Sequence, residues 1–354
     1  MPTQRLTIAA NNLNHPLSKA SIETAARILR DGGTVAFPTE TVYGLGANAL
    51  RSDAVEKIFE AKRRPSWDPL IVHVASMEML GRVAVDIPAS GRLLMSAFWP
   101  GPLTLLLPRH PQVPDIVTAG RPRVGVRIPK HSVAQALLRA ADIPIAAPSA
   151  NTFGHTSPTS AQHVLDDLDG RIDAILDGGE VDAAAVGLES TVVDVCEDPC
   201  IVYRPGVITL DQIRAVCPGA LAFDESARKT DARPEALPSP GVGLRHYAPK
   251  ARLILVEYGR EQARRFAEQA AVLAAGSGTV GLLLPSDFSE DFAIGGIIYD
   301  WGSWQDREEL ARRLFAGLRW LDARGATVIL APLPEAEGIG VAIRDRLQKA
   351  AKTD

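Results

Sequence analysis

Short apolar runs that alternate with helical patterns are the feature that most limits what this chain can fold into. In the C-terminal third, three runs without a polar residue alternate with three longer segments of helical character. The runs are 253–256, 280–284 and 328–330, and the helical segments lie near 259–275, 303–323 and 339–352. Strands that are apolar on both faces are typical of parallel sheets covered by helices. The alternation therefore predicts a small, Rossmann-like parallel α/β domain.

The N-terminal part carries a second series of predicted elements and is also expected to be α/β. Helical patterns cover 18–31, 52–62, 88–98 and 159–168, and strand patterns cover 34–37, 70–74, 103–107, 124–128, 190–195 and 201–206. In the strand 124–128, the aliphatic residues at the even positions share one face, so Arg127 takes the other. There Arg127 is either solvated or a binding group.

The composition changes between the two series. Five prolines punctuate residues 212–250, which hold few apolar runs: Pro218, Pro234, Pro238, Pro240 and Pro249. Such a segment is typical of an ordered or semi-ordered linker. We therefore divide the chain into a first domain at 1–211, a linker at 212–250 and a second domain at 251–354. A length of 354 residues agrees with two domains.

Charge and cysteine content argue against several classes of function. The net charge is −4, which argues against a basic surface for general nucleic-acid binding. Three cysteines without close pairing favour neither a disulfide framework nor a zinc site. The N-terminus lacks the apolar segment of a signal peptide, and no apolar run reaches 18 residues. We therefore expect a cytoplasmic protein without a membrane span.

Two nucleotide-binding glycine motifs can be set aside. Residues 44–49 match G-x-G-x-x-A, but the next predicted helix begins only at about Ser52, its expected N-cap. Cations also stand where a dinucleotide site would carry its acidic residue. The P-loop pattern does not occur in the sequence.

The end of the predicted helix 52–62 is a candidate binding element. Its apolar stripe is Val55, Ile58 and Phe59, and the next position on that stripe is Lys62, which should face the core side. In the following strand His73 lies on the face opposite the aliphatic side chains of 70, 72 and 74. These features suggest a polar cleft, although cations at a helix C-terminus often only complement its dipole.

A run rich in hydroxyl groups follows at 148–159, where residues such as Ser149, Asn151 and Ser157 stand close together. Such a run is either turn chemistry with a helix N-cap, or a loop that holds an anion on its backbone N–H groups.

Read together, the motifs resemble the threonylcarbamoyl-AMP synthase family in its long two-domain form, with a YrdC-like N-terminal domain. The resemblance lies in the order of short segments between about residues 20 and 250. These segments are 38–45, 62–73, 100–104, 124–129, 148–151, 190–192, 204–206, 239–241 and 245–249.

The resemblance implies both a fold and a reaction. The first domain would be a twisted open α/β sheet with a basic concave cleft. The enzyme would be a nucleotidyltransferase that joins L-threonine, bicarbonate and ATP into threonylcarbamoyl-AMP and releases pyrophosphate. Partner proteins would then transfer the threonylcarbamoyl group to tRNA, and the enzyme itself would make at most a weak tRNA contact. ATP would be a substrate in this reaction, and Mg²⁺ is expected with its phosphates on general grounds.

The resemblance also implies roles for individual residues. Lys62 and Arg64 would be catalytic. Threonine would be bound by Thr41, His73, Arg127 and Ser190. ATP would be bound by Lys62, Arg64, Asp68, Arg123, Ser149, Asn151, Ser157, Arg204 and Tyr247. No side chain is assigned to a metal. Asp68 stands where the family often has Asn, Arg123 where Thr is common, and 242–244 replace a Met, basic, aromatic run.

Two other functions and one open question remain at this stage. An RNA-binding module without adenylate-forming activity is a rival, against which the acidic charge counts. A carbamoyl-transfer enzyme of hydrogenase maturation is a second, but its C-x-x-C zinc motifs are missing from the sequence. The linker, with its His246–Tyr247 pair, is expected either to fold over the cleft as a lid or to act only as a tether.

Overall fold

A computed structural model describes residues 2–9, 12–179, 187–224, 239, 246–257, 268, 272, 278–291 and 296–352 of the chain. The chain divides into two compact units. The N-terminal unit comprises 1–153, 158–185 and 189–243, and the C-terminal unit comprises 154–157, 186–188 and 244–354. Most of the predicted linker and most of the predicted helix 259–275 lie outside the described residues.

The N-terminal unit is built on a mixed sheet, which has eleven strands in the described part of the chain. Their order is β1-β8-β2-β3-β7-β4-β6-β5-β9-β10-β11. The bounds are β1 (Gln4–Thr7), β2 (Val35–Phe37), β3 (Gly44–Asn48), β4 (Ile71–His73), β5 (Leu103–Pro108), β6 (Arg123–Arg127), β7 (Ile145–Ala146), β8 (Ala174–Asp177), β9 (Thr191–Asp194), β10 (Ile201–Arg204) and β11 (Leu221–Ala222).

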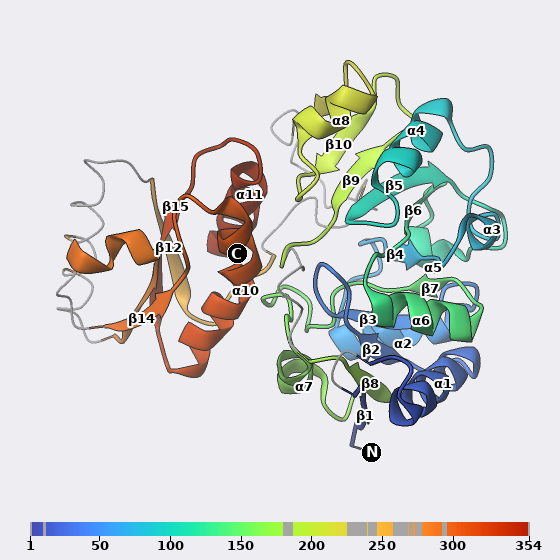
Figure 1. Cartoon of the computed structure of the whole chain (residues 1–354), viewed down its shortest axis with the longest axis horizontal. Coiled ribbons are helices and arrows are strands. Elements are labelled where there is room, and N and C mark those ends of the chain that lie inside the picture. Colours follow the sequence, from blue (N-terminus) through green and yellow to red (C-terminus); the bar gives the residue numbers. More distant parts are fainter. Residues whose placement is uncertain are drawn as a thin grey trace. The chain divides into compact units, whose positions relative to one another are not determined.

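Helices cover both faces of this sheet (Figure 1). Their bounds are α1 (Pro16–Arg30), α2 (Ser52–Lys62), α3 (Met77–Leu80), α4 (Ala89–Phe98), α5 (Asp115–Thr118), α6 (Ser132–Ala141), α7 (Ala161–Leu168) and α8 (Leu210–Val216). One core lies under α1 and α6, and a larger one lies under α2, α4, α7 and α8. The alternation along β2 shows the split, because Val35 and Phe37 enter the first core and Ala36 the second.

Helix α2 shows how the local sequence aims the cations. Val55, Ile58 and Phe59 are buried, as the stripe predicts, and Lys62 is only 1% exposed. The helix ends at Arg63, which is left-handed (φ 54°) and donates its N–H to the carbonyl of Glu60. This turn leaves Arg63 exposed between two buried cations.

The predicted N-cap of α2 was wrong by one residue. Ser52 is the first helical residue, and the N-cap is Arg51, whose side chain makes no cap hydrogen bond. Arg51 instead pairs with the Asp53 carboxylate, 2.5 Å away, in the first turn. The acidic residue in the first turn complements the helix dipole, so the helix begins without a hydroxyl cap.

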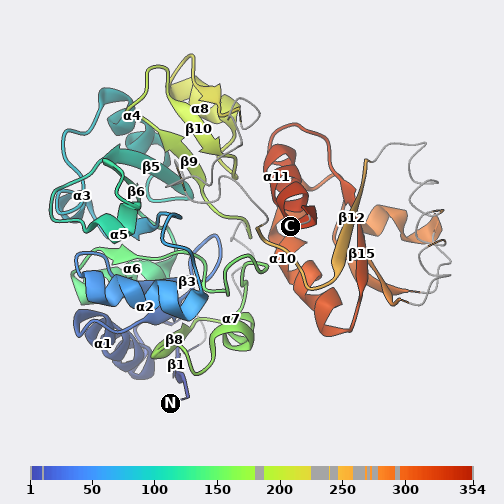
Figure 2. The same ribbon diagram turned by 180° about the vertical axis from the view of Figure 1, so that it is seen from behind.

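The C-terminal unit has a parallel sheet, four-stranded in its described part, in the order β12-β15-β13-β14, with α10 and α11 on one face (Figure 2). The bounds are β12 (Arg252–Glu257), β13 (Val280–Leu284), η2 (Ser286–Asp291), β14 (Ile297–Asp300), α10 (Arg307–Ala323), β15 (Val328–Leu333) and α11 (Gly340–Ala351). The predicted parallel α/β domain is therefore confirmed. Among the residues that the structure describes, none of the helices combines the length and apolar character needed to cross a membrane.

Candidate active site

Strand direction brings several polar residues to one edge of the large sheet. β4 and β6 are parallel, with His73 beside Arg127 in the register, and both strands end at this edge. β5 is antiparallel to β6 and parallel to β9, so β5 and β9 both begin there. β10 runs antiparallel to β9 and ends there with Arg204. The ends of β4, β6 and β10 and the starts of β5 and β9 therefore lie at the same edge of the sheet, although their residues are far apart in the sequence.

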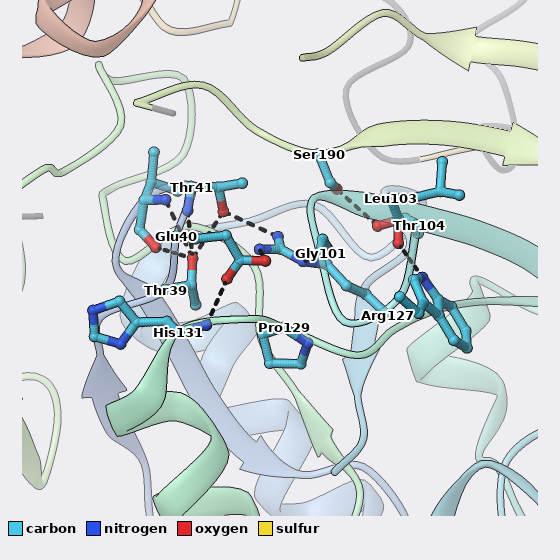
Figure 3. Close-up of polar contacts among 12 residues, drawn as sticks. Thr39, Glu40, Thr41, Gly101, Leu103, Thr104, Arg127, Pro129, His131 and Ser190 are labelled. Carbon is cyan, nitrogen blue, oxygen red and sulfur yellow. Dashed lines mark hydrogen bonds and ion pairs between the residues drawn. The ribbon is translucent and has the colours of Figure 1, made fainter. Parts of the chain in front are cut away.

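Arg127 is the centre of the first group of side chains, which we call the Arg127 cluster: Thr39, Glu40, Thr41, His73 and Arg127. The Arg127 Nε donates to the carbonyl of Gly101 at 3.2 Å, and its Nη1 donates to the Thr41 hydroxyl at 3.0 Å. Its Nη2 lies 2.6 Å from the Glu40 Oε1. Figure 3 shows both Glu40 and Thr41 turned toward the guanidinium.

Burial beside a cation keeps the His73 imidazole neutral. The pKa of His73 is lowered to about 3, first by burial and then by the charge of Arg127, while Glu40 acts in the opposite direction. A neutral imidazole can accept a hydrogen bond as well as donate one. His73 is therefore suited to orient a substrate group and is not an acid near neutral pH.

A second group, the Arg204 cluster, consists of Thr104, Ser190 and Arg204. The Ser190 hydroxyl lies 2.7 Å from the Thr104 hydroxyl and accepts a hydrogen bond from the Arg204 Nη2 at 3.1 Å. The Arg204 Nε also donates to the Ser190 carbonyl at 3.0 Å. The Ser190–Thr104 contact, drawn in Figure 3, fixes the start of β9 against the start of β5.

The third group, the Lys62 cluster, lies at the end of α2 and comprises Lys62, Arg64, Asp68, Ser149 and Asn151. The Lys62 Nζ donates to the carbonyls of Ser149 and Asn151, each at 2.5 Å. Burial, and then the nearby charge of Arg64, holds the pKa of Lys62 well below its ordinary value. In its protonated form Lys62 has three N–H donors, so these two carbonyls would leave the third N–H for an anionic ligand, whose charge would favour that form.

Arg64 and Asp68 form a buried ion pair in the same cluster, with the Arg64 Nη2 2.9 Å from the Asp68 Oδ2. Arg64 also donates to the carbonyls of Asp68 and Pro69 and lies over the Phe153 ring. Burial raises the pKa of Asp68, against the charges of Arg64, Lys62 and Arg204. Because the charge of Arg204 acts on Asp68, the Lys62 and Arg204 clusters belong to one electrostatic environment.

Comparison with known proteins covers almost the whole chain. A family model described as "Telomere recombination" (Sua5, YciO, YrdC) matches residues 27–206, and one described as "Threonylcarbamoyl-AMP synthase, C-terminal domain" matches 208–352. The chain is 43% identical, over 96% of both lengths, to a threonylcarbamoyl-AMP synthase of Pyrococcus abyssi. It is 42% identical to that of Bacillus subtilis, over 93% of this chain and 92% of the relative.

The chain belongs to the threonylcarbamoyl-AMP synthase family. Its structure is similar to that of P. abyssi Sua5 complexed with L-threonine, with a TM-score of 0.88, 40% identity and coverage of 99% of this chain and 97% of the other. A double variant of the same Sua5, with His and Tyr changed to Ala, gives the same TM-score and identity. The two-domain form and the fold class predicted from sequence are therefore confirmed.

The structure brings most of the predicted site residues of this family member together. Within the N-terminal unit, the residues proposed for threonine, namely Thr41, His73, Arg127 and Ser190, lie in the Arg127 and Arg204 clusters. Five of those proposed for ATP, namely Lys62, Arg64, Asp68, Ser149 and Asn151, form the Lys62 cluster, and a sixth, Arg204, acts on it electrostatically. Their binding roles stay predictions.

Three residues predicted to bind ATP have other contacts in the structure. Arg123, at the start of β6, pairs with the Asp194 and Glu197 carboxylates. Ser157 belongs to the C-terminal unit, where its carbonyl accepts from Arg319 at 3.3 Å. Tyr247 is buried in that unit, and its ring stacks on Phe315 with a centroid distance of 5.7 Å. Whether these three residues also contact the nucleotide stays a prediction.

The sequence reasoning missed Glu40, Thr39 and Thr104. Each contacts a predicted site residue, and each is buried. Glu40 and Thr39 stand in the segment 38–45 that carried the family resemblance, which was a usable signal. Thr104 stands in an apolar strand, where a hydroxyl usually needs a partner, and this pattern could have identified it.

A metal site made only of protein side chains has no support in the described part of the chain. Within those residues, no three His, Cys, Asp or Glu side chains lie close enough together to hold an ion. The site instead carries cationic and hydroxyl groups, which suit carboxylates and phosphates.

Proposed function

We propose that this protein synthesises threonylcarbamoyl-AMP from L-threonine, bicarbonate and ATP, with release of pyrophosphate. One observation supports the proposal most strongly. The cations Lys62, Arg127 and Arg204 are nearly inaccessible to water, yet they belong to the three polar clusters of a family member that covers 96% of its P. abyssi relative. Buried cations in such a site are suited to a small ligand with several negative charges.

The reaction concentrates negative charge. The threonine nitrogen gains a carboxyl group from bicarbonate, with loss of water, and a carbamate oxygen then attacks the α-phosphorus of ATP. The bond from the α-phosphorus to the bridging oxygen breaks, and pyrophosphate leaves. Such a step depends on positioning and electrostatic stabilisation rather than on a protein nucleophile. This balance makes the protein a nucleotidyltransferase in the proposed reaction.

The proposed roles follow the three clusters. Lys62, Arg64 and Arg204 would stabilise the phosphates, with the third N–H of Lys62 as a donor. Arg127, with the neutral His73 and the hydroxyls of Thr41 and Ser190, would hold threonine. Ser149, Asn151 and Ser157 would surround the adenylate, with Asp68, Arg123 and Tyr247 as further nucleotide contacts. ATP would bring Mg²⁺ on its phosphates, where the ion would neutralise charge that these cations do not reach.

An RNA-binding module is less well supported. The cations of the clusters are buried, whereas binding to a nucleic-acid backbone requires exposed Lys and Arg along a surface.

The destination of the product would be tRNA, through separate threonylcarbamoyl-transfer proteins. Use of ATP and delivery to tRNA favour the cytoplasm as the compartment.

Pyrophosphate release with one substrate left out at a time tests the proposal. We expect release only when threonine, bicarbonate and ATP are all present, together with a product that has the mass of threonylcarbamoyl-AMP. Release of phosphate or pyrophosphate that does not depend on threonine would contradict the proposal. tRNA binding without any such product would favour the RNA-binding alternative.

A further inference from the structure

Glu40 is a buried acid that the proposed reaction does not use directly. It lies in the segment between β2 and β3 and is 7% exposed. Its Oε1 lies 2.6 Å from the Arg127 Nη2, and its Oε2 accepts the backbone N–H of His131 at 3.3 Å. Burial alone would raise the pKa of Glu40, but the charge of Arg127 and the backbone N–H of Lys130 bring it below the ordinary value. Glu40 is therefore a carboxylate at neutral pH.

The Arg127 guanidinium is held at each of its three nitrogens. Nε is fixed by the Gly101 carbonyl, Nη1 by the Thr41 hydroxyl and Nη2 by Glu40 (Figure 3). Thr41 is itself fixed, because its hydroxyl lies 2.8 Å from that of Thr39. A guanidinium has five N–H donors, and Arg127 uses two of them in hydrogen bonds to Gly101 and Thr41, while Nη2 is ion-paired with Glu40 without hydrogen-bond geometry, so donors remain for a ligand. The protein contacts thus define the plane in which the remaining donors lie.

A buried ion pair is weak support for stability, because the cost of removing both charges from water can exceed their attraction. Replacement of a buried ion pair by hydrophobic residues of similar volume is often neutral or stabilising. A fixed guanidinium is useful when a planar, two-point contact with a carboxylate is required. The Glu40–Arg127 ion pair lies beside His73 and Thr41, two residues proposed to bind threonine, so its fixed guanidinium is placed for contact with the threonine carboxylate.

We propose that Glu40 is a positioning residue that acts through Arg127, orienting the guanidinium so that its remaining N–H groups meet the carboxylate of threonine. This inference rests on the proposed function of the site. Glu40 itself does not touch the substrate. Loss of its charge would let the guanidinium turn away from the carboxylate, so threonine binding would weaken while ATP binding would change little.

Threonine binding and steady-state kinetics of Glu40→Gln test the proposal. We expect the threonine Kd and KM to rise at least about tenfold, while the KM for ATP stays within about twofold. Glu23→Gln is the matched control, since it removes a surface ion pair with Arg30 on α1 and should leave both constants unchanged. Thermal denaturation of each variant shows whether it is folded. Glu40→Asp is the second variant, because it keeps the charge but shortens the reach to Arg127.

A double-mutant cycle separates positioning from a structural role. Arg127→Lys should weaken threonine binding by itself, and Glu40→Gln in that background should add less than about twofold, because its effect passes through Arg127. Additive effects, equal losses for ATP and threonine, or an unchanged threonine Kd in either folded Glu40 variant would each overturn the proposal. If the wild type binds threonine but forms no threonylcarbamoyl-AMP, the proposed function fails, and the binding data still decide the role of Glu40.

Discussion

At the residue scale, the site consists of ionisable groups that the protein has removed from water. An unpaired buried charge costs several kcal/mol, so each such group needs partners or a ligand. Arg127 and Arg64 have carboxylate partners, whereas Lys62 relies on two carbonyl oxygens. Burial and then the charge of Arg64 lower the pKa of Lys62, against the charges of Asp68 and Asp167, so the charged form of Lys62 is disfavoured in the absence of a ligand. An anionic ligand at Lys62 would supply the missing charge.

The two buried cations at the end of α2 should matter for the reaction, and the exposed one between them should not. Lys62→Ala and Arg64→Ala are each expected to lower threonylcarbamoyl-AMP formation at least about tenfold, near 1.4 kcal/mol of transition-state stabilisation. Arg63→Ala is the control, because Arg63 is exposed. Pyrophosphate release from the three purified variants is the measurement. Wild-type turnover in folded Lys62→Ala protein would refute the assignment of Lys62.

His73 should make stability depend on pH in the acidic range. Its folded pKa is about 3 and its ordinary value is 6.5, so between these values only the unfolded state takes up the proton. The free energy of unfolding should therefore fall as the pH falls from about 6.5, by up to about 1.4 kcal/mol per pH unit. His73→Gln should lack this contribution. Urea denaturation between pH 7 and 4.5 measures the difference, and His15→Asn, at the cap of α1, is the control.

Parallel pH profiles for wild type and His73→Gln would show that His73 does not remain neutral in the folded protein. Arg127 and Glu40 are the charged groups that act on it, so the same series with Glu40→Gln would show whether their balance controls the effect.

At the element scale, ends of helices and strands supply the functional groups, while their interiors supply the core. The apolar stripe of α2 points Lys62 inward, and the left-handed Arg63 after it lets the chain turn so that Arg64 is buried as well. In the C-terminal unit, a side chain of α10 binds the backbone of the short loop 154–157. Arg319 donates to the carbonyls of Thr156 and Ser157, and the loop also pairs with Ala248. A loop whose backbone is bound by a helix loses much of its conformational freedom.

Loss of the α10 contact should loosen residues 154–157. Arg319→Ala is expected to increase amide hydrogen exchange in peptides that cover this loop and to lower the stability of the C-terminal unit by about 1–3 kcal/mol, because it removes hydrogen bonds from a charged donor. Arg324→Ala is the matched control, since Arg324 is exposed at the end of the same helix and stacks on Trp320. Unchanged exchange in the loop would show that the other contacts suffice to hold it.

At the scale of the whole molecule, the proposed active site depends on the complete N-terminal sheet. Glu40 meets Arg127, and Arg204 meets Ser190, which in turn meets Thr104. These contacts join residues far apart in sequence, so the site forms only when the strands between them have paired. The C-terminal unit has its own parallel sheet and its own apolar core. Each unit therefore has the means to fold around its own core.

Threonine binding should protect the N-terminal sheet edge selectively. Hydrogen exchange with mass spectrometry is expected to show slower amide exchange in peptides covering 38–43, 100–106 and 188–194 when threonine is added. A bound ligand stabilises the folded state, so local opening of the backbone hydrogen bonds around it becomes rarer. Peptides from 297–351 should change little. Protection confined to the C-terminal unit would contradict the assignment of threonine to the Arg127 cluster.

The sequence by itself determined which helices and strands form and which of their faces are buried, wherever the pattern of apolar residues is regular along the chain. The stripe on 52–62 predicted the inward direction of Lys62, and apolar runs predicted the strands of the C-terminal sheet. Periodicity reflects which face of an element is buried, so it can be read locally. It gave no strand at β3, where Gly44–Asn48 was noted only for a glycine motif but pairs with β2 and β7. Pairing with two neighbours overrode weak local propensity there.

Only the tertiary structure decided which groups meet. The sequence placed Arg127 on a polar face but left solvent and ligand as open choices, and it gave no sign that Glu40 would reach the guanidinium. Arg123 lies on the same strand, yet it pairs with Asp194 and Glu197 instead. Tyr247 packs on Phe315 within the C-terminal unit. Partners of this kind depend on strand order and on contacts between distant segments, which no local pattern encodes.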